Sequence, residues 1–99
     1  MLTLKKIFTC LEKFCGEGNV VFKKGKGSTF VTVYCNGNKV MYLVKSYCSG
    51  WVCLLNFTFD SYDTKPFLIK SDNINRFESF IETIDVLSGN YLSDFRRAA

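Results

Sequence analysis

Histidine is absent from this chain of 99 residues. Its absence removes the most common general base, the Ser–His and Cys–His nucleophile pairs, and the most common metal ligand. Acid–base chemistry would then depend on carboxylates such as Asp60 and Asp63. Both lie in a polar segment typical of a turn, where aspartate side chains usually bond to their own backbone. We therefore expect a protein that is not an enzyme and needs no cofactor.

Closely spaced cysteine pairs are also missing. The chain has five cysteines, Cys10, Cys15, Cys35, Cys48 and Cys53. Four residues separate Cys10 from Cys15, and the last two cysteines have the same spacing, whereas zinc sites require Cys-x-x-Cys or similar knuckles. The beginning of the sequence has no apolar core or cleavage site of a signal peptide. We expect no metal, and reduced thiols that pack as small hydrophobic groups in the cytoplasm.

Proline and long apolar runs are scarce. Pro66 is the single proline, and no apolar run approaches the length of a membrane span, so we expect a soluble protein with no membrane segment. The length suits one hydrophobic core and predicts a single domain over residues 1–99. The net charge of +4 favours acidic or polyanionic partners. Abundant Phe, Tyr, Asn, Lys and Ile suggest an AT-rich coding genome, as in many small phage and virus proteins.

Apolar residues recur at helical spacing near both ends of the chain. The first helix is predicted over residues 2–15, capped by Thr3 and ended by Gly16 and Gly18. Its apolar side holds Leu4, Ile7, Phe8, Leu11, Phe14 and Cys15. The second helix ends near Gly89. Its N-cap candidates are Ser71, Asp72 and Asn73, and its apolar stripe is Ile74, Phe77, Phe80, Ile81, Ile84 and Leu87. A last turn within residues 90–99 would dock through Tyr91, Leu92 and Phe95.

The segment Thr29–Phe59 predicts three antiparallel strands. Asn36–Gly37 is a strong signal for a two-residue hairpin turn, because Asn and Gly adopt positive φ angles at low cost. With these two residues as the loop, Val33 pairs with Val40, and opposed residues share a face of the sheet.

A second turn at Ser49–Gly50 would pair Val44 with Leu55, and it sorts the residues in the same way as the first. One face is a predicted core face made of Val31, Val33, Val40, Tyr42, Val44, Trp51, Cys53, Leu55, Phe57 and Phe59. The other face mixes polar and apolar side chains and holds Phe30, Thr32, Tyr34, Lys39, Met41, Leu43, Lys45, Val52, Leu54, Asn56, Thr58 and Asp60. A mixed face is typical of a surface that is partly wet or that meets a partner.

Two further strands complete the predicted fold. Residues 19–24 read as a strand, in which either Val20 and Phe22 or Val21 face the core. Residues 67–70 read as a short edge strand, because Pro66 precedes it. The predicted fold class is α+β: an antiparallel β-meander of four to five strands with an N-terminal and a C-terminal helix packed on one face.

The mixed face and the loop beside it hold the candidate binding residues. These are Phe30, Tyr34, Lys39, Met41 and Lys45 on the strands, and Lys23, Lys24 and Lys26 around the loop. Aromatic rings beside cations on a sheet can stack on bases and contact phosphates. The same apolar groups could instead pack on a second copy of the chain or beneath a helix. The loop Gly25–Ser28 has the composition of a phosphate cradle but not the Walker pattern, because it leads into a strand; a solvated hairpin tip is the alternative.

The end of the predicted sheet carries one family resemblance. Lys65–Lys70 followed by a helix resembles in outline the sheet-to-helix ending of the PC4/PUR group of single-strand binders. The likeness covers about a third of the chain and implies a nucleic-acid-binding sheet by analogy alone.

Two functional hypotheses follow. The first is a non-enzymatic protein-interaction module, a regulator or inhibitor encoded by a phage or virus and directed at a host or defence protein. The alternative is a single-stranded DNA- or RNA-binding protein that uses the basic, aromatic sheet face. A homodimer is a third arrangement that the mixed face would allow.

Overall fold

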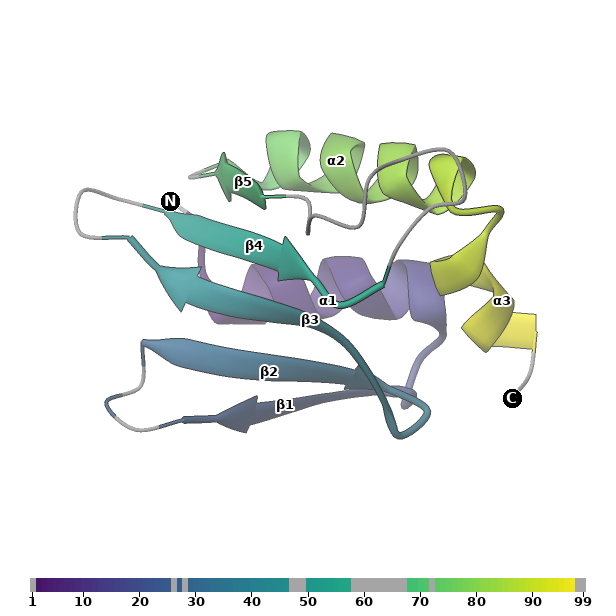
Figure 1. Ribbon diagram of the computed structural model, residues 1–99, viewed down its shortest axis with the longest axis horizontal. Coiled ribbons are helices and arrows are strands. Elements are labelled where there is room, and N and C mark those ends of the chain that lie inside the picture. Colours follow the sequence, from purple (N-terminus) through teal and green to yellow (C-terminus); the bar gives the residue numbers. More distant parts are fainter. Residues whose placement is uncertain are drawn as a thin grey trace.

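The computed structural model shows a five-stranded antiparallel sheet with helices on one side (Figure 1). The structure describes residues 2–25, 27, 29–46, 50–57, 68–71 and 73–97. The strands are β1 (Val20–Lys24), β2 (Phe30–Cys35), β3 (Asn38–Lys45), β4 (Trp51–Leu55) and β5 (Leu68–Ser71), and the helices are α1 (Leu4–Cys15), α2 (Ile74–Leu87) and α3 (Tyr91–Arg97). The strand order β1-β2-β3-β4-β5 is a meander, which confirms the predicted α+β class.

The first helix begins and ends as its sequence predicts. The Thr3 hydroxyl oxygen accepts a hydrogen bond of 3.2 Å from the backbone N–H of Lys6 and thereby caps α1. Gly16 ends the helix with a φ of 100°, a conformation that costs glycine little. Ile7 and Leu11 are fully buried against the sheet, as expected for the apolar side of an amphipathic helix.

The second helix is capped by Asn73, whose side-chain oxygen accepts from the backbone N–H groups of Asn75 and Arg76. Phe77 and Ile81 of its apolar stripe are buried, but the prediction was wrong for the last member. Leu87 is 42% exposed because α2 ends there and the chain turns away into α3.

A buried carboxylate joins α2 to α3. Asp85 is 7% exposed, and its Oδ1 accepts hydrogen bonds of 3.0 Å from the backbone N–H groups of both Leu92 and Ser93. The first N–H groups of a helix have no partner within the helix, so this carboxylate caps α3 from a neighbouring helix. Leu92 is fully buried as a result, and Tyr91 and Phe95 pack against the core.

The first strand settles an alternative that the sequence leaves open. Val20 is buried and Phe22 packs against the core, where its ring meets that of Phe8 edge-on with centroids 5.1 Å apart. Val21, between them, is 49% exposed. Val20 and Phe22 therefore face the helices, and Val21 faces away from them.

The hairpin between β2 and β3 has the predicted turn but not the predicted register. Asn36 and Gly37 have φ angles of 51° and 80°, as the turn requires. The register then shifts, so that Val33 pairs with Met41 rather than with Val40. One extra residue on one strand is a β-bulge, and it reverses the faces of the residues that follow.

The hairpin between β3 and β4 also departs from the predicted register. Leu43 pairs with Cys53, and the backbone N–H of Ser46 donates to the carbonyl of Gly50 at 3.0 Å. The connection is therefore longer than the two-residue turn at Ser49–Gly50. This second shift offsets the first, so β4 keeps the faces that the sequence predicts.

Only the part of β3 that follows the bulge, residues 41–45, is inverted by these two shifts, whereas Val40 is fully buried as predicted. Met41 and Leu43 are fully buried, whereas Tyr42 and Val44 are half-buried on the opposite side. The predicted core face was thus wrong for Tyr42 and Val44, and it was right for its described members on β2 and β4. Phe59, Thr58 and Asp60 are outside the described residues.

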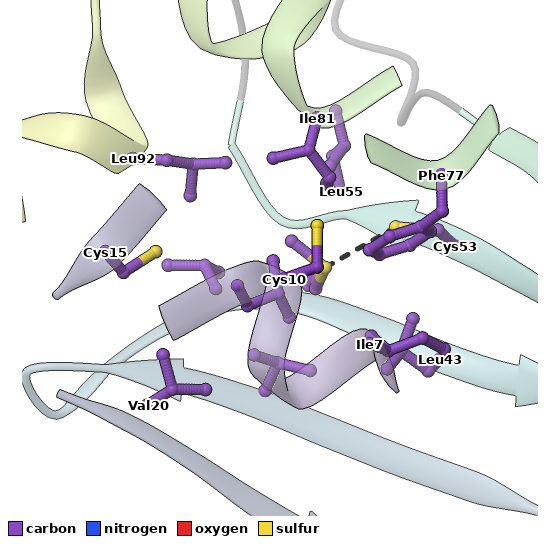
Figure 2. Close-up of a cluster of buried hydrophobic side chains, with 14 of the residues drawn as sticks. Ile7, Cys10, Cys15, Val20, Leu43, Cys53, Leu55, Phe77, Ile81 and Leu92 are labelled. Carbon is purple, nitrogen blue, oxygen red and sulfur yellow. Dashed lines mark hydrogen bonds between the residues drawn. The ribbon is translucent and has the colours of Figure 1, made fainter. Parts of the chain in front are cut away.

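The core lies between the sheet and the helices. Figure 2 shows Ile7 and Cys10 of α1 and Phe77 and Ile81 of α2 directed toward Leu43, Cys53 and Leu55 of the sheet. At the end of this core, the ring of Phe57 stacks on that of Tyr91 with centroids 4.4 Å apart. Across the described ranges, no helix combines the length and the apolar character needed to cross a membrane.

Candidate binding surface

The side of the sheet that faces away from the helices is an open surface whose residues the strand pairing defines. We call it the outer face. It consists of Val21, Lys23, Phe30, Thr32, Tyr34, Lys39, Tyr42, Val44, Val52 and Leu54. Each of these side chains is half-buried or exposed, and the three described helices all pack on the opposite side.

The middle of the outer face is apolar. Val44 pairs with Phe30 on one side and with Val52 on the other, and Tyr42 pairs with Leu54. The rings of Phe30 and Tyr42 are tilted by 32°, with centroids 5.4 Å apart. Directly opposed and diagonal residues of neighbouring strands touch, so these five side chains form a continuous apolar patch.

Lysines stand at the margin of this patch. The ammonium nitrogen of Lys23 lies 5.0 Å from the centre of the Tyr34 ring, and that of Lys39 lies 5.5 Å from the centre of the Tyr42 ring. At these distances each cation is attracted to the face of its ring. Each of these two lysines therefore contacts an aromatic ring of the outer face: Lys23 contacts Tyr34, which was predicted for this face, and Lys39 contacts Tyr42, which was not.

The charge of the outer face has one sign. Between residues 18 and 59 the sequence contains lysines at five positions and no aspartate or glutamate. The described strands β1 to β4 consequently present no carboxylate, and the acidic residues of the described chain belong to the helices and to the turn after α1. A surface of this kind attracts acidic or polyanionic partners.

The loop between β1 and β2 positions Phe30 at the edge of the face. The backbone N–H of Gly25 donates to the carbonyl of Phe30 at 2.8 Å. A Cβ atom at Gly25 would lie 3.1 Å from Cδ1 of the Phe30 ring, so only glycine leaves the ring its present place without a shift. Lys26 and Ser28, the other candidates for a phosphate cradle, lie outside the described residues.

Four of the eight predicted binding residues lie on the outer face, three lie on the opposite side of the sheet, and Lys26 is outside the described residues. Phe30, Tyr34, Lys39 and Lys23 all belong to the outer face.

The placement of Met41 and Lys45 on this face was wrong. The β-bulge turns Met41 into the core, where it is fully buried, and it turns Lys45 to the same side as Trp51. Lys24 pairs with Val31 and is likewise on the helix side, exposed at the end of its strand.

Sequence reasoning assigned Tyr42 and Val44 to the core and so missed them as surface residues. No signal in the segment Val40–Val44 distinguishes the two registers, because apolar residues follow one another without alternation. The uninterrupted apolar run only indicates that a bulge is tolerated here, because either register places an apolar side chain in the core.

Three of the four described thiols have a raised pKa, whereas the hydrogen bond with Cys15 lowers the pKa of Cys35, which is fully buried. Burial raises the pKa of Cys53 to about 12, and burial together with the nearby Glu78 carboxylate raises the pKa of Cys10 to about 11. The hydrogen bond to Cys35, and burial, raise the pKa of Cys15. A thiol with a raised pKa is protonated near neutral pH and reacts slowly.

Metal and carboxylate chemistry have no described site. Within the ranges that the structure covers, histidine, cysteine, aspartate and glutamate nowhere form a group of three that could hold a metal ion. Asp60 and Asp63 lie outside those ranges.

Comparison of this chain with known proteins identifies no similar protein. No protein-family model, no curated protein and no solved structure matches this chain. The outline similarity to the PC4/PUR group therefore carries no argument, and a functional proposal has to stand on the geometry of the outer face.

Proposed function

We propose that this protein is a non-enzymatic protein-interaction module that binds a partner protein through the outer face of its sheet. The observation that carries the proposal is the continuous apolar patch around Val44, with Lys23 and Lys39 at its margin and no carboxylate on the described strands beside it. Protein interfaces have this anatomy, with an apolar centre that loses its water and a charged rim.

The chemistry of the patch favours a protein over a nucleic acid. Val44, Val52 and Leu54 are aliphatic and offer no flat surface on which a base could stack. The rings of Tyr34 and Tyr42 are each already in contact with a lysine ammonium group. The complementary partner surface would place apolar side chains over the centre and carboxylates opposite the lysines.

Binding of this kind makes a small protein a regulator or inhibitor, because it occupies a surface that its partner needs. We further propose that it acts inside the cell. Cys10, Cys15, Cys35 and Cys53 are free thiols, the state that a reducing compartment maintains. The phage or virus origin suggested by composition stays a prediction.

The experiment is affinity purification of the tagged protein from the cells in which it is naturally produced, with a matched pair of variants. Val44→Glu places a carboxylate in the middle of the apolar patch. Val86→Glu makes the same change on α2, where Val86 is 72% exposed. The proposal predicts a stoichiometric partner that is retained by wild type and by Val86→Glu and lost with Val44→Glu.

Two results would contradict it. The first is equal recovery of the partner by both variants when circular dichroism shows both to be folded. The second is self-association of the purified wild type that Val44→Glu abolishes, because the outer face would then be a homodimer interface.

Single-stranded nucleic acid is a second candidate, favoured by the exposed ring of Phe30 and by Lys23 and Lys39, which have no carboxylate beside them on the described strands. Phosphate contacts release counterions, so affinity for a mixed-sequence oligonucleotide should fall steeply from low to moderate salt. Each of Lys23→Glu and Lys39→Glu should reduce the slope of log affinity against log salt by about 1. No change in fluorescence anisotropy at low salt rejects this candidate.

A further inference from the structure

The sheet ends on one side in an unpaired edge. Among the described strands β1 pairs with β2 alone, and Figure 1 shows it as the outermost strand with no described element beyond it. Its five residues, Val20–Lys24, include no proline and pair with β2 without a bulge. Natural sheets commonly shield such an edge with a bulge, a proline or a covering loop. The edge of β1 has none of these within the described residues.

The hydrogen bonds to β2 decide which backbone groups of β1 point outward. The N–H of Asn36 donates to the carbonyl of Asn19 at 3.0 Å, and the N–H of Gly25 donates to the carbonyl of Phe30 at 2.8 Å. In an antiparallel pair, bonded and non-bonded positions alternate. Positions 21 and 23 are therefore bonded to β2, whereas the N–H and C=O groups of positions 20, 22 and 24 point away from the sheet.

These outward groups form a row that suits an extended chain. Phe22 and Lys24 each present a donor and an acceptor at the edge, and alternate residues of a strand are about 7 Å apart. Within the described chain no further strand pairs with them. The backbone of an added strand matches every group of such a row, and this is how peptides bind to sheet edges. An apolar ligand or a single anion would leave most of the row without a partner other than water.

The helix α1 holds this edge in place. The ring of Phe22 meets that of Phe8 with centroids 5.1 Å apart, and Val20 is buried in the core. The side-chain amide of Asn19 donates to the carbonyl of Cys15, the last residue of α1, at 2.8 Å. An edge that is already ordered loses little conformational entropy when a strand pairs with it.

The side chains of β1 decide the chemistry of the added strand. Lys23 and Lys24 are exposed and lie on opposite faces of the strand, and neither β1 nor its neighbour β2 contains a carboxylate. Val21, in the other half of the strand, is 49% exposed. Carboxylates beside the two lysines and an apolar residue beside Val21 would complement this edge, because cross-strand neighbours interact.

A second copy of this chain is a poorer occupant. Antiparallel pairing of β1 with itself would bring two copies of Lys23 and Lys24 to one seam, and β1 has no carboxylate to neutralise them. Lysines on an edge strand oppose self-association for this reason. The charge of β1 therefore favours an acidic strand from another protein.

We propose that the edge of β1 binds an extended acidic segment of the partner protein, which adds to the sheet antiparallel to β1. Antiparallel pairing is the more stable arrangement per residue. Val21 and Lys23 also belong to the outer face. The inference thus rests on the proposed function for its protein partner, and it extends the contact from the apolar patch to the sheet edge.

The probe is a synthetic peptide of about eight residues, an ordinary strand length, with glutamates in its first half and valines and threonines in its second. Antiparallel addition then places the glutamates beside Lys23 and Lys24. One control peptide has glutamine in place of every glutamate. A second control keeps all side chains but carries N-methyl groups on its central backbone nitrogens, so that it cannot donate along the strand.

Amide hydrogen exchange, followed by NMR of the isotope-labelled protein, detects the added strand directly. In the free protein the amides of Val21 and Lys23 should be protected by their bonds to β2, and those of Phe22 and Lys24 should exchange rapidly. The acidic peptide should protect Phe22 and Lys24 and leave the other two as they were. The glutamine peptide should bind about threefold more weakly, because exposed ion pairs are lost. The N-methylated peptide should not bind.

Two variants at one position separate the backbone from the charge. Lys24→Pro removes an outward N–H, a change that edge strands tolerate, and it should weaken binding of the acidic peptide by about tenfold. Lys24→Gln keeps the N–H and should weaken binding by only about twofold. Val86→Glu, on the exposed side of α2, should leave binding unchanged.

Several results would overturn the proposal. Equal binding of the N-methylated peptide, which needs no variant to fold, would exclude backbone pairing. Equal effects of Lys24→Pro and Lys24→Gln, with circular dichroism showing both to be folded, would do the same. Failure of the acidic peptide to protect Phe22 and Lys24 would leave the edge without this occupant. Protection of those amides in the free protein that disappears on dilution would assign the edge to a second copy.

The peptide tests the edge alone, whereas Val44→Glu tests the apolar patch. A partner that is lost with Val44→Glu, together with a peptide that does not bind, would reject this inference and keep the proposed function. Protection of Phe22 and Lys24 by the peptide, together with a partner that Val44→Glu does not affect, would reject the proposed function and keep the edge as a strand-binding site.

Discussion

The inverted strand β3 makes a prediction that separates the observed register from the one that the hairpin turns predict. Leu43 is fully buried, whereas its neighbour Val44 is half-buried on the outer face. The two turns predict the opposite arrangement. Comparing the two single variants, Leu43→Ala and Val44→Ala, therefore shows which of the two adjacent side chains belongs to the core.

The expected magnitudes differ clearly. Leu43→Ala removes a fully buried side chain and leaves a cavity, which should lower the free energy of unfolding by about 3 kcal/mol. Val44→Ala removes two methyl groups that are only partly withdrawn from water, and should cost about 1 kcal/mol. With a urea m-value of about 1.5 kcal/mol/M, the midpoints should fall by about 2 M and about 0.7 M.

The assay is urea unfolding followed by the fluorescence of Trp51, the single tryptophan. Its ring is 7% exposed and its Nε1–H donates to the carbonyl of Leu2 at 3.2 Å, so unfolding should change its emission. Leu43→Val, a milder change expected to cost about 1 kcal/mol, keeps the comparison usable if the alanine variant does not fold. A larger loss for Val44→Ala than for Leu43→Ala would refute the bulge and with it the composition of the outer face.

Two further predictions concern the buried polar and thiol groups. Asp85→Ala should lower the free energy of unfolding by about 1–3 kcal/mol, because a buried N–H group of Leu92 and a partly buried N–H group of Ser93 lose their acceptor. Asp85→Asn keeps an oxygen acceptor and should lower the free energy of unfolding by less. Hydrogen exchange of the Leu92 and Ser93 amides measures the loss of these bonds. If both variants left these amides as well protected as in wild type, Asp85 would not cap α3. Burial raises the pKa of Cys10 and Cys53 above the ordinary thiol value of about 9, so the folded state holds these protons more tightly than the unfolded state does. Their contribution to stability should be complete below about pH 9 and decline as pH rises toward 11–12. Thiol labelling near pH 8 with mass-spectrometric mapping should leave both residues unmodified in the folded protein, and rapid modification would refute their burial.

Local signals in the sequence predict the ends of the elements well. Thr3 and Asn73 cap the helices they precede, and Asn36–Gly37 forms the hairpin turn. In each case a side chain or a backbone preference acts within three residues of its own position, so no knowledge of the rest of the chain is needed. The position of β5 at the sheet edge after Pro66 follows in the same way.

The faces of the sheet depend on more distant interactions. The register set by the turn at Asn36–Gly37 changes at Val40, where the bulge lies. The residues after the bulge are apolar on both faces, so the sequence contains nothing that conflicts with the unshifted register. Met41 and Lys45 were for that reason placed on the wrong side. The candidate residues on β2, such as Phe30 and Tyr34, were placed correctly because β2 itself has no extra residue.

Tertiary features had no local signal. Asp85 reads in the sequence as one polar residue of an amphipathic helix, and only the folding of α3 back onto α2 gives it buried N–H partners. A groove lined by residues of both α1 and α2 likewise requires two helices that are more than 50 residues apart in the chain to lie side by side.

The central claim is that the outer face of the sheet binds the protein partner. The most direct measurement is photo-crosslinking with benzoylphenylalanine at two positions, in place of Tyr42 on the outer face and in place of Val86 on α2. Illumination in the producing cells should yield a single partner adduct from position 42 and none from position 86. An adduct from position 86 alone, or none from position 42 in a folded variant, would contradict the assignment of the sheet face as the binding surface.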